Sequence, residues 1–288
     1  MQYTRDRLRV AFISFRKGKT TMENFNHKVV VITGASEGIG RALALKFAEQ
    51  KSKIVISARN ENRLNELKSE IESSGASALV VPADVTDPDA CKNLMERAFE
   101  EYGRIDVLIT NAGRTMWTPF EEIKDLSIFK QLMDLNYLGC VYCTYYALPY
   151  LKKTKGQIVG VSSVAGLNGV PSRTAYSASK HAMFGFFDSL RIELKDTGVS
   201  VTMIAPDFVL SEMHKRALDG FGNSLGKSPL QASKIMTAEE CAALIMPAVE
   251  KRDRLLITSL RGKLGRWLKL ISPSTVDKIA AKAIKEAK

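Results

Sequence analysis

Short apolar runs alternate with longer amphipathic segments along most of this chain. The runs are rich in β-branched residues, as in strands that a parallel sheet buries on both faces. The longer segments repeat apolar residues at helical spacing. We therefore predict strands at 28–33, 53–58, 78–82, 105–110, 156–163, 199–205 and 254–258. Helices are predicted at 41–50, 62–73, 88–102, 123–135, 136–153, 174–197 and 259–271, after Thr237 and beyond Pro273. This alternation indicates an α/β protein with a doubly wound parallel sheet.

A glycine-rich turn follows the first predicted strand. Gly34, Gly38 and Gly40 follow Thr33 with the spacing G-x-x-x-G-x-G, and a helical pattern begins directly afterwards. Glycines let a backbone approach a pyrophosphate, and a helix N-terminus offers N–H donors and the positive end of a dipole. The turn is not a P-loop, because no Gly-Lys-Ser/Thr follows it. Strand, glycine turn and helix together predict a dinucleotide site.

The end of the second predicted strand is expected to select the cofactor. A carboxylate at this place would hydrogen-bond the ribose 2′-hydroxyl of NAD. The chain instead reads Ile56-Ser57-Ala58-Arg59, and an arginine pairs well with a 2′-phosphate. We therefore predict NADP(H), and the alternative is that Arg59 is an ordinary solvated loop residue. Glu37 argues against NADP(H), because a basic residue there would help to bind the same phosphate.

The stretch from Ser163 to Lys180 carries the candidate chemistry. Tyr176 and Lys180 are four residues apart, so they share one face of a helix. A tyrosine normally has a pKa of about 10, and a neighbouring ammonium lowers that pKa by favouring the phenolate. Ser163 ends a predicted strand, so Ser163 and Tyr176 can converge on one substrate oxygen. This arrangement predicts acid/base chemistry on an alcohol or carbonyl, although Tyr-x-x-x-Lys also occurs by chance in ordinary helices.

Two further strand ends carry polar residues. Asp84 and Val85 follow the third strand, where they are placed to contact adenine, and Asn111 follows the fourth. The helix at 136–153 is rich in tyrosine, which is typical of either a core or a subunit interface. Residues 207–235 show no strong period, so we expect a lid or a substrate loop there.

The C-terminal segment mixes apolar and basic residues. One apolar stripe at helical spacing, here called the C-terminal stripe, comprises Leu260, Leu264, Trp267, Leu268 and Ile271. Gly262 and Gly265 lower helix propensity, so the helix is expected to depend on docking. One interpretation packs the stripe over the substrate loop or a neighbouring subunit. The other is a monotopic anchor, in which the stripe enters a membrane interface and the basic residues meet anionic head groups.

The basic excess of the chain lies at its two ends. The formal net charge of the 288 residues is +11, of which residues 1–21 hold +5 and residues 250–288 hold +7. The body between them is close to neutral, so the charge does not indicate a nucleic-acid-binding protein. Residues 1–24 are expected to be a loosely attached extension. They contain either a basic targeting peptide or, as we favour, a translated segment ahead of Met22.

Cysteine and histidine usage indicates no metal site. The four cysteines and three histidines lack the spacing of a zinc site or a disulfide framework, which favours a reducing compartment. No apolar run approaches the ~18–20 residues that a membrane-spanning helix needs. We expect a cytoplasmic protein, with peripheral membrane contact through the C-terminus as the open alternative.

The combined motifs closely resemble those of the short-chain dehydrogenase/reductase family. They occur in order and at family spacing, as Thr33-Gly34-x-x-x-Gly38-x-Gly40, Asp84, Asn111-Ala112-Gly113, Asn136, Ser163, Tyr176-x-x-x-Lys180 and Pro206. The resemblance covers about residues 25–258. Within the family the chain is most similar to the NADP-dependent 11β-hydroxysteroid-dehydrogenase-like group. Two departures are Asp207 in place of the usual glycine after Pro206, and Ser211 where threonine is common.

The resemblance implies a Rossmann-type sheet of seven strands in the order 3-2-1-4-5-6-7. It also implies that Tyr176 is the acid/base, that Lys180 binds the nicotinamide ribose, and that Lys180 lowers the pKa of Tyr176. It also implies that Ser163 orients the substrate oxygen and Asn136 anchors a relay water. With the patterns above, the predicted cofactor contacts are Gly34, Ser36, Gly38, Ile39, Arg59, Asp84, Val85, Asn111, Tyr176, Lys180 and Pro206.

These observations predict an NADP(H)-dependent oxidoreductase. It would transfer a hydride between the nicotinamide and a ketone or secondary alcohol, with an apolar, steroid- or lipid-like substrate. The catalytic domain would span 25–258 and a basic helical extension 259–288. The family resemblance implies a homodimer or homotetramer. The rival hypothesis is a catalytically silent dinucleotide-binding regulator, which would have no need for the Ser163, Tyr176, Lys180 and Asn136 set.

Overall fold

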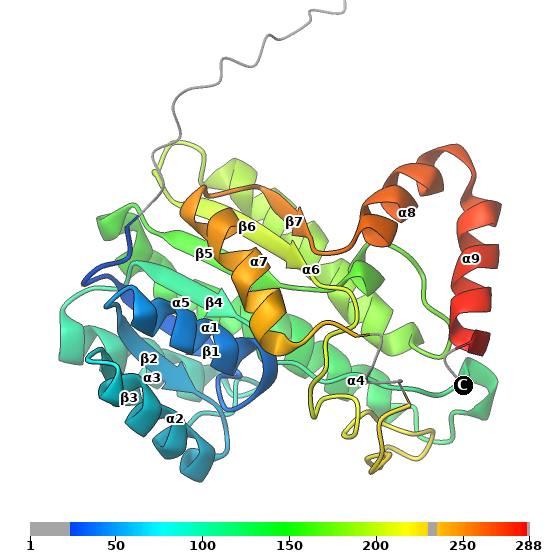
Figure 1. The fold of residues 1–288 in the computed structure, drawn as a ribbon, viewed down its shortest axis with the longest axis horizontal. Helices are drawn as coiled ribbons and strands as arrows, with labels where there is room; N and C mark the ends of the chain where they lie inside the picture. Colours follow the sequence, from blue (N-terminus) through cyan, green and yellow to red (C-terminus); the bar gives the residue numbers. More distant parts are fainter. Residues whose placement is uncertain (1–23, 230–234, 287–288) are drawn as a thin grey trace, which may run out of the picture.

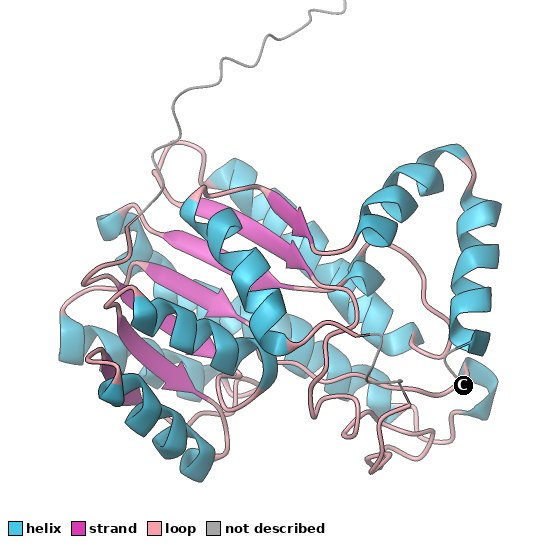
Figure 2. Ribbon diagram, in the orientation of Figure 1, coloured by secondary structure: helices cyan, strands magenta, loops and turns pink. Residues whose placement is uncertain are grey.

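Seven parallel strands form the centre of the protein (Figures 1 and 2). The computed structural model describes residues 24–229 and 235–286, so most of the extension predicted at 1–24 lies outside the described residues. The strands are β1 (Val29–Thr33), β2 (Lys53–Ser57), β3 (Ser77–Val80), β4 (Val107–Thr110), β5 (Gln157–Val161), β6 (Ser200–Ala205) and β7 (Leu255–Ile257). Their order is β3-β2-β1-β4-β5-β6-β7, and all adjacent pairs are parallel. The predicted Rossmann-type fold is confirmed.

Helices cover both faces of the sheet, as a doubly wound fold requires (Figure 1). One face carries α1 (Gly38–Glu49), α2 (Glu61–Ser73) and α7 (Ala238–Glu250). The other carries α3 (Pro88–Tyr102), α5 (Gly139–Thr154) and α6 (Thr174–Glu193). Helix α4 (Ser127–Met133) packs against α6. Two more helices, α8 (Leu260–Ile271) and α9 (Pro273–Glu286), project beyond the carboxyl ends of the strands (Figure 1).

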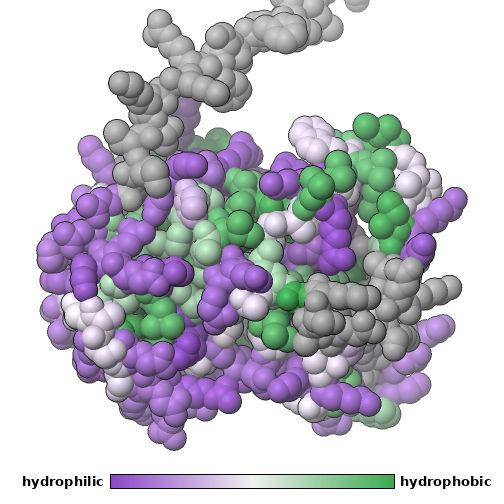
Figure 3. Space-filling model, in the orientation of Figure 1, coloured by the Kyte–Doolittle hydropathy of each residue, from purple (hydrophilic) through white to green (hydrophobic). Residues whose placement is uncertain are grey.

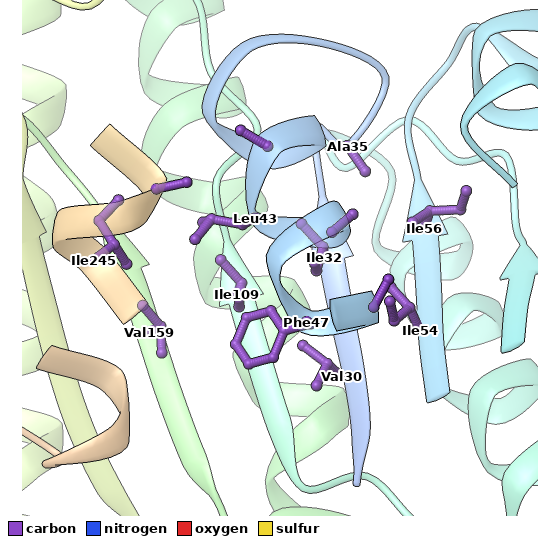
Figure 4. Packing of buried hydrophobic residues seen from close by; sticks show 14 of the residues in the cluster. Val30, Ile32, Ala35, Leu43, Phe47, Ile54, Ile56, Ile109, Val159 and Ile245 are labelled. Atoms are coloured by element: carbon purple, nitrogen blue, oxygen red, sulfur yellow. The ribbon is translucent and has the colours of Figure 1, made fainter. Parts of the chain in front are cut away.

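Strand β1 shows why the sheet needs both helical layers. Its five residues are all fully or almost fully buried. Because successive side chains of a strand point to opposite faces, Val30 and Ile32 join the cluster beneath α1 and α7. Val29 and Val31 join the cluster beneath α3 and α5. Figure 4 shows the first cluster, with Phe47 of α1 packed over the strand side chains. Each such side chain contributes about 1.5–3 kcal/mol by burial.

Two helices begin at the capping residues that the sequence predicted. The Asp87 side chain accepts a hydrogen bond from the backbone of Asp89 at the start of α3. Thr237 and Glu240 form the predicted capping box of α7. The helix predicted at 136–153 differs at its start, because residues 134–138 form a π-helix before α5 begins. Such π-bulges occur frequently at functional sites.

The segment predicted as a lid or substrate loop is irregular in its described part. Residues 207–229 and 235 contain isolated bridges but no helix or strand, while 230–234 lie outside the described residues. Arg114 attaches this segment to the end of β4. Its Nε donates to the Arg216 carbonyl at 3.0 Å and its Nη2 to the Ser224 hydroxyl at 2.9 Å. The loop is therefore held beside the strand ends.

Asp207, which replaces the family's usual glycine, attaches helix α8. Its Oδ1 accepts a hydrogen bond from Nη2 of Arg261 at 2.6 Å, and its Oδ2 accepts one from the Ser259 hydroxyl. Burial raises the pKa of the Asp207 carboxyl, but the bonds from Arg261 and Ser259 outweigh burial and lower the pKa. Gly262 of α8 is buried, and a Cβ there would lie 2.8 Å from side-chain atoms of Ile257 and Val164. The glycine that weakens the helix therefore permits its close docking.

The C-terminal stripe does not pack over the substrate loop, which corrects one prediction. Four of its members, Leu260, Leu264, Trp267 and Ile271, are 60–83% exposed. Helix α8 instead docks through the face that carries Arg261, Gly262 and Gly265. Two glycines make that face flat, so the bulky residues point outward. Figure 3 shows hydrophobic surface on this part of the molecule. A neighbouring subunit or a membrane interface stays a prediction.

We expect Asp207 and Arg261 to stabilise the docked α8 as a coupled pair. Asp207→Asn, Arg261→Met and the double variant form a cycle, with local opening of α8 measured by hydrogen exchange of its amides. Because Arg261 is largely exposed, we expect a coupling free energy of only about 1 kcal/mol. Single-variant effects that simply add up in the double variant would contradict this role. Lys263→Met, which removes an exposed charge from the same helix, serves as the control.

Candidate active site

A cavity of about 660 Å³ lies at the carboxyl ends of the strands, and is here called the central cavity. Residues that follow β1 to β6 line it, and α8 and α9 form part of its wall. All the predicted cofactor contacts line this cavity, namely Gly34, Ser36, Gly38, Ile39, Arg59, Asp84, Val85, Asn111, Tyr176, Lys180 and Pro206. The fold therefore brings together residues that are far apart in the sequence.

The glycine turn has the close backbone packing that a pyrophosphate site needs. Gly34 has a φ of +65°, which favours glycine. A Cβ on Gly40 would lie 2.3 Å from the Gly34 carbonyl oxygen and 2.5 Å from Nδ2 of Asn111, so only glycine fits. Asn111 Nδ2 donates to the carbonyls of Thr33 and Gly34 at 3.1 and 3.0 Å. The N-terminus of α1 therefore faces the central cavity without intervening side-chain bulk, which fits a dinucleotide.

The end of β2 presents a group of paired charges. Arg59 lines the cavity with its side chain 73% exposed, and lies 3.7 Å from Asp84. The negative charge of Glu37 was the evidence against a bound 2′-phosphate, but this carboxylate is paired with two arginines. Arg63 donates to it at 2.7 Å, and Arg216 forms an ion pair with its other oxygen. Glu37 therefore holds two cations near this end of the cavity, and its charge is offset.

Ser163 and Tyr176 meet at the cavity wall. Tyr176 is 6% and Ser163 9% exposed, and both line the cavity. Burial raises the pKa of the Tyr176 phenol, while a side-chain hydrogen bond with Ser163 and the charge of Arg173 act to lower that pKa. The sequence predicted a pKa lowered by Lys180, so this prediction is corrected. Burial is the largest effect, and the opposing groups are Ser163 and Arg173.

Lys180 is a buried cation on the same helix. Its Nζ lies 6.0 Å from the centre of the Tyr176 ring and donates to the Val161 carbonyl at 3.0 Å. Burial lowers the pKa of its ammonium to about 8. The side chain is therefore mainly charged at neutral pH, although it is only 3% exposed. It can supply positive charge to the polar end of the cavity.

Asn136 does not line the cavity, unlike the other predicted catalytic residues. Its Oδ1 accepts a bond from the Arg114 amide at 2.8 Å, and its Nδ2 donates to the Arg114 carbonyl and the Ser179 hydroxyl. Its side chain therefore joins the end of β4 to helix α6. The role of anchoring a relay water stays a prediction. Asn136 lies in the π-helix at 134–138, and such π-helical turns occur frequently at functional sites.

Sequence reasoning missed Arg173, which lines the cavity three residues before Tyr176. It is only 4% exposed, and its guanidinium stacks against the rings of Trp117 and Phe208 at 4.3 and 5.0 Å. Its helical spacing from Tyr176 was the available signal. The cavity-lining residues Arg261 and Ile279 of the C-terminal helices were also missed, because their placement depends on tertiary docking.

Lys180 is expected to destabilise the cofactor-free protein at neutral pH. Its pKa is about 8 when folded, against 10.5 for an ordinary lysine, so the unfolded state binds more protons between these values. The unfolding free energy should therefore rise with pH through this window. Lys180→Met should add about 1–3 kcal/mol of stability at pH 7, and this gain should shrink towards pH 10. Urea unfolding of both proteins across this range measures the gap, and a gap independent of pH would contradict the argument.

Three comparisons with known proteins agree on the family. The family profile described as short chain dehydrogenase matches residues 28–220. The chain is 36% identical to a dehydrogenase/reductase SDR family protein 7-like from Dictyostelium discoideum, over 96% of this chain and 89% of that protein. It is 34% identical to 11-beta-hydroxysteroid dehydrogenase 1A from Arabidopsis thaliana, over 88% and 75% respectively.

A solved structure supports the same fold. It is a short-chain dehydrogenase/reductase from Burkholderia phymatum in complex with NAD, with a TM-score of 0.78 and 24% identity over 88% of this chain and 96% of that chain. The sequence motifs, the sheet order and the matched relatives are mutually consistent. The chain therefore belongs to the short-chain dehydrogenase/reductase family of oxidoreductases.

Proposed function

We propose that the protein is an NADP(H)-dependent oxidoreductase that interconverts ketones and secondary alcohols. The observation that carries this proposal is that Ser163, Tyr176 and Lys180 line the same cavity as the glycine turn after β1. An acid/base group and a dinucleotide-binding turn therefore open onto one space. A bound nicotinamide would supply or accept the hydride there.

Tyr176 would move the proton in this reaction. In the reductive direction, its hydroxyl would donate a proton to the carbonyl oxygen as that oxygen gains negative charge. Ser163 would donate a hydrogen bond to the same oxygen and hold it in place. Once the proton has left, the charge of Arg173 and the hydrogen bond with Ser163 would stabilise the phenolate, because both act to lower the pKa of Tyr176. The buried ammonium of Lys180, which donates to the Val161 carbonyl, would bind the nicotinamide ribose. In the oxidative direction the phenolate would accept the alcohol proton.

Three charges support NADP(H) over NAD(H). Arg59 lies at the end of β2 with its side chain largely exposed, and can pair with a 2′-phosphate. Ser57 and Ala58 provide no carboxylate for a ribose 2′-hydroxyl. Arg63 and Arg216 form ion pairs with Glu37, so their positive charges offset the repulsion between this carboxylate and a phosphate. The relative from Burkholderia phymatum was solved with NAD, which makes a direct comparison of the two cofactors essential.

The wall of the cavity supports an apolar, steroid- or lipid-like substrate. Away from the glycine turn it is lined by Val170, Phe208, Met213, Val276 and Ile279. Apolar walls with a few polar groups are typical of small-molecule sites. The name of the relative 11-beta-hydroxysteroid dehydrogenase 1A agrees with a large hydrophobic ketone.

We also propose a homo-oligomer assembled through α5 and α6. Tyr145 of α5 is 70% and Ile192 of α6 is 75% exposed, and both are unusual exposures for large apolar side chains. Peripheral membrane contact through the exposed C-terminal stripe is a separate proposal that needs no membrane-spanning helix. Among the described residues, no helix has the length and apolar character to cross a bilayer.

The acid/base role predicts a large effect of Tyr176→Phe. The ring and its packing remain, but the proton donor is lost, so turnover should fall by at least about 10²–10⁴-fold. The measurement is NADPH oxidation against a panel of steroid, lipid, sugar and aromatic ketones. NADPH binding, followed by its fluorescence, should persist. Tyr102→Phe is the control, since its hydroxyl bonds Ser77 away from the cavity. Near-normal turnover in Tyr176→Phe would refute the mechanism, and no turnover of any ketone by the parent protein would favour a silent regulator.

The cofactor proposal predicts that Ala58→Asp changes the preference towards NADH. The new carboxylate repels a 2′-phosphate, competes for Arg59 and accepts a bond from a ribose hydroxyl. The ratio of kcat/KM for NADPH to that for NADH should fall by about 10-fold or more, which corresponds to ~1.4 kcal/mol. Ala58→Asn introduces a side chain of the same size as aspartate but without its charge, so it should change this ratio much less. Equal or better turnover with NADH in the unchanged protein would contradict the assignment.

A further inference from the structure

Arg173 is a buried cation without a hydrogen-bonded acceptor on one edge. The residue is 4% exposed and lines the central cavity. Its Nε and Nη2 have no hydrogen-bond partner among the described residues and are shielded from solvent. Burial lowers the pKa of its guanidinium, but only to about 10, so the group is charged at neutral pH. Burying a charge without an acceptor is costly, so such a group is unusual in a folded protein.

The carboxylates of the cavity wall are already occupied. Among the described lining residues, the acidic ones are Glu37, Asp84 and Asp207, and each has an arginine partner other than Arg173. Of these three carboxylates, Asp207 has the largest effect on the pKa of Arg173, which it raises. Its two oxygens nevertheless accept hydrogen bonds from Arg261 and Ser259. Among the described residues no carboxylate is therefore hydrogen-bonded to Arg173, and its guanidinium stacks on aromatic rings, which are weaker partners than a carboxylate.

A second polar atom beside Arg173 also lacks a partner. His214 is 6% exposed and lines the cavity, and its Nδ1 has no hydrogen-bond partner among the described residues. Burial, and then the charge of Arg173, lowers the pKa of His214 to about 4, so its ring is neutral at pH 7. The ring has a hydrogen bond with the Val209 backbone, which acts to raise its pKa, so the single N–H of the neutral ring is used there and Nδ1 is an acceptor. The ring of Phe208 contacts both residues, with its centre 5.0 Å from the guanidinium and 6.2 Å from the imidazole.

The free edge of Arg173 has the geometry that matches a carboxylate. The N–H bonds of Nε and Nη2 lie in the guanidinium plane and point to the same side, so they can donate two parallel bonds to two oxygens. The apolar wall near Val170 and Phe208 would hold the rest of such a ligand. An apolar cavity with one unneutralised fork of donors is therefore suited to an apolar molecule with a single acid group.

We propose that Arg173 binds a carboxylate on the substrate, so that the preferred substrates are apolar oxo-acids. This inference rests on the proposed function, because it assigns the ketone of the same molecule to Ser163 and Tyr176. Arg173 directly precedes α6, and its guanidinium carbon lies 5.8 Å from the centre of the Tyr176 ring. Binding would require the guanidinium to shift between its aromatic neighbours, towards the cavity. The acid and the ketone would then lie close together, because Arg173 and Tyr176 are neighbours in space.

The test compares an acid with its neutral ester on the cofactor-loaded protein. The probes are 4-oxodecanoate and its methyl ester, titrated by calorimetry into the protein saturated with NADP⁺, where no reduction can occur. The acid should bind roughly 10- to 100-fold more tightly than the ester, which is the factor that hydrogen bonds between charged groups supply. Equal affinity for the two probes would overturn the proposal, whatever the turnover.

Three variants assign the preference to Arg173. Arg173→Met keeps an apolar chain between the rings and should bind acid and ester equally. Arg173→Lys keeps the charge without the fork and should retain part of the preference. Lys215→Met removes an exposed charge next to His214 but outside the cavity wall, and should keep the full preference. NADPH fluorescence and thermal unfolding check that each variant folds. If Arg173→Met does not fold, Arg173→Lys decides the question: a reduced preference supports the proposal, and an unchanged preference overturns it.

The results separate this inference from the proposed function. If Arg173 only supports the fold or tunes Tyr176, Arg173→Met will change both probes by the same factor, and the proposal fails. If the parent protein reduces the ester with NADPH but shows no acid preference, the carboxylate site fails and the proposed function stands. If the acid binds selectively but neither probe is reduced, the carboxylate site stands and the proposed function fails for these ketones.

Discussion

The structure depends on a small hydrogen-bonded junction between the ends of β1 and β4. The Thr33 hydroxyl accepts bonds from the amides of Asn111 and Ala112, at 3.1 and 3.2 Å. The Asn111 side chain returns two bonds to the carbonyls of Thr33 and Gly34. These contacts fix the glycine turn against the neighbouring strand. Because Gly40 packs within this junction, the start of α1 is fixed by the same contacts.

The same junction extends to helix α6, which carries Tyr176. Arg114 lies three residues beyond Asn111. Its backbone N–H donates to the Asn136 side chain, and its backbone carbonyl accepts a bond from the same side chain. Asn136 then donates to the Ser179 hydroxyl, which itself donates to the Tyr176 carbonyl at 2.8 Å. The turn that would hold the pyrophosphate and the tyrosine that would move the proton are thus linked by one polar network. A site that needs sub-ångström positioning gains from such support behind its surface residues.

The cost of this site is a concentration of buried charge. Lys180 in the second turn of α6 and Arg173 directly before α6 are both almost fully buried. Neither has a carboxylate partner among the described residues: Lys180 donates to the Val161 carbonyl, and Arg173 stacks on rings. Buried cations of this kind weaken a fold and are retained where chemistry uses them. The surrounding sheet, apolar on both faces, provides the stability that tolerates them.

Sequence reasoning succeeded where the determinants are local or repeat along the chain. The strands and the capping residues Asp87 and Thr237 follow from local patterns, and the rule that ligands bind at strand ends places Ser163 and the glycine turn at the cavity. Other predicted cofactor contacts, such as Ser36 and Pro206, came from the family resemblance. The pKa of Tyr176 was misjudged, because burial depends on what packs around a residue. Arg173 was missed for a similar reason, since its partners Trp117 and Phe208 are distant in sequence.

Helix α8 shows the same limit in another form. Its amphipathic pattern left open whether the bulky stripe packs over the protein, against a neighbouring subunit or into a membrane interface, and the two glycines select the inward face. Gly262 approaches Val164, directly beside Ser163, and Arg261 binds Asp207, directly after Pro206. The Phe208 ring lies between Arg261 and Arg173, with its centre 5.3 and 5.0 Å from their guanidinium carbons. The Phe208 ring therefore contacts both Arg261, which docks α8, and Arg173. A change in how the C-terminal helices sit would reach the substrate side of the cavity through Phe208.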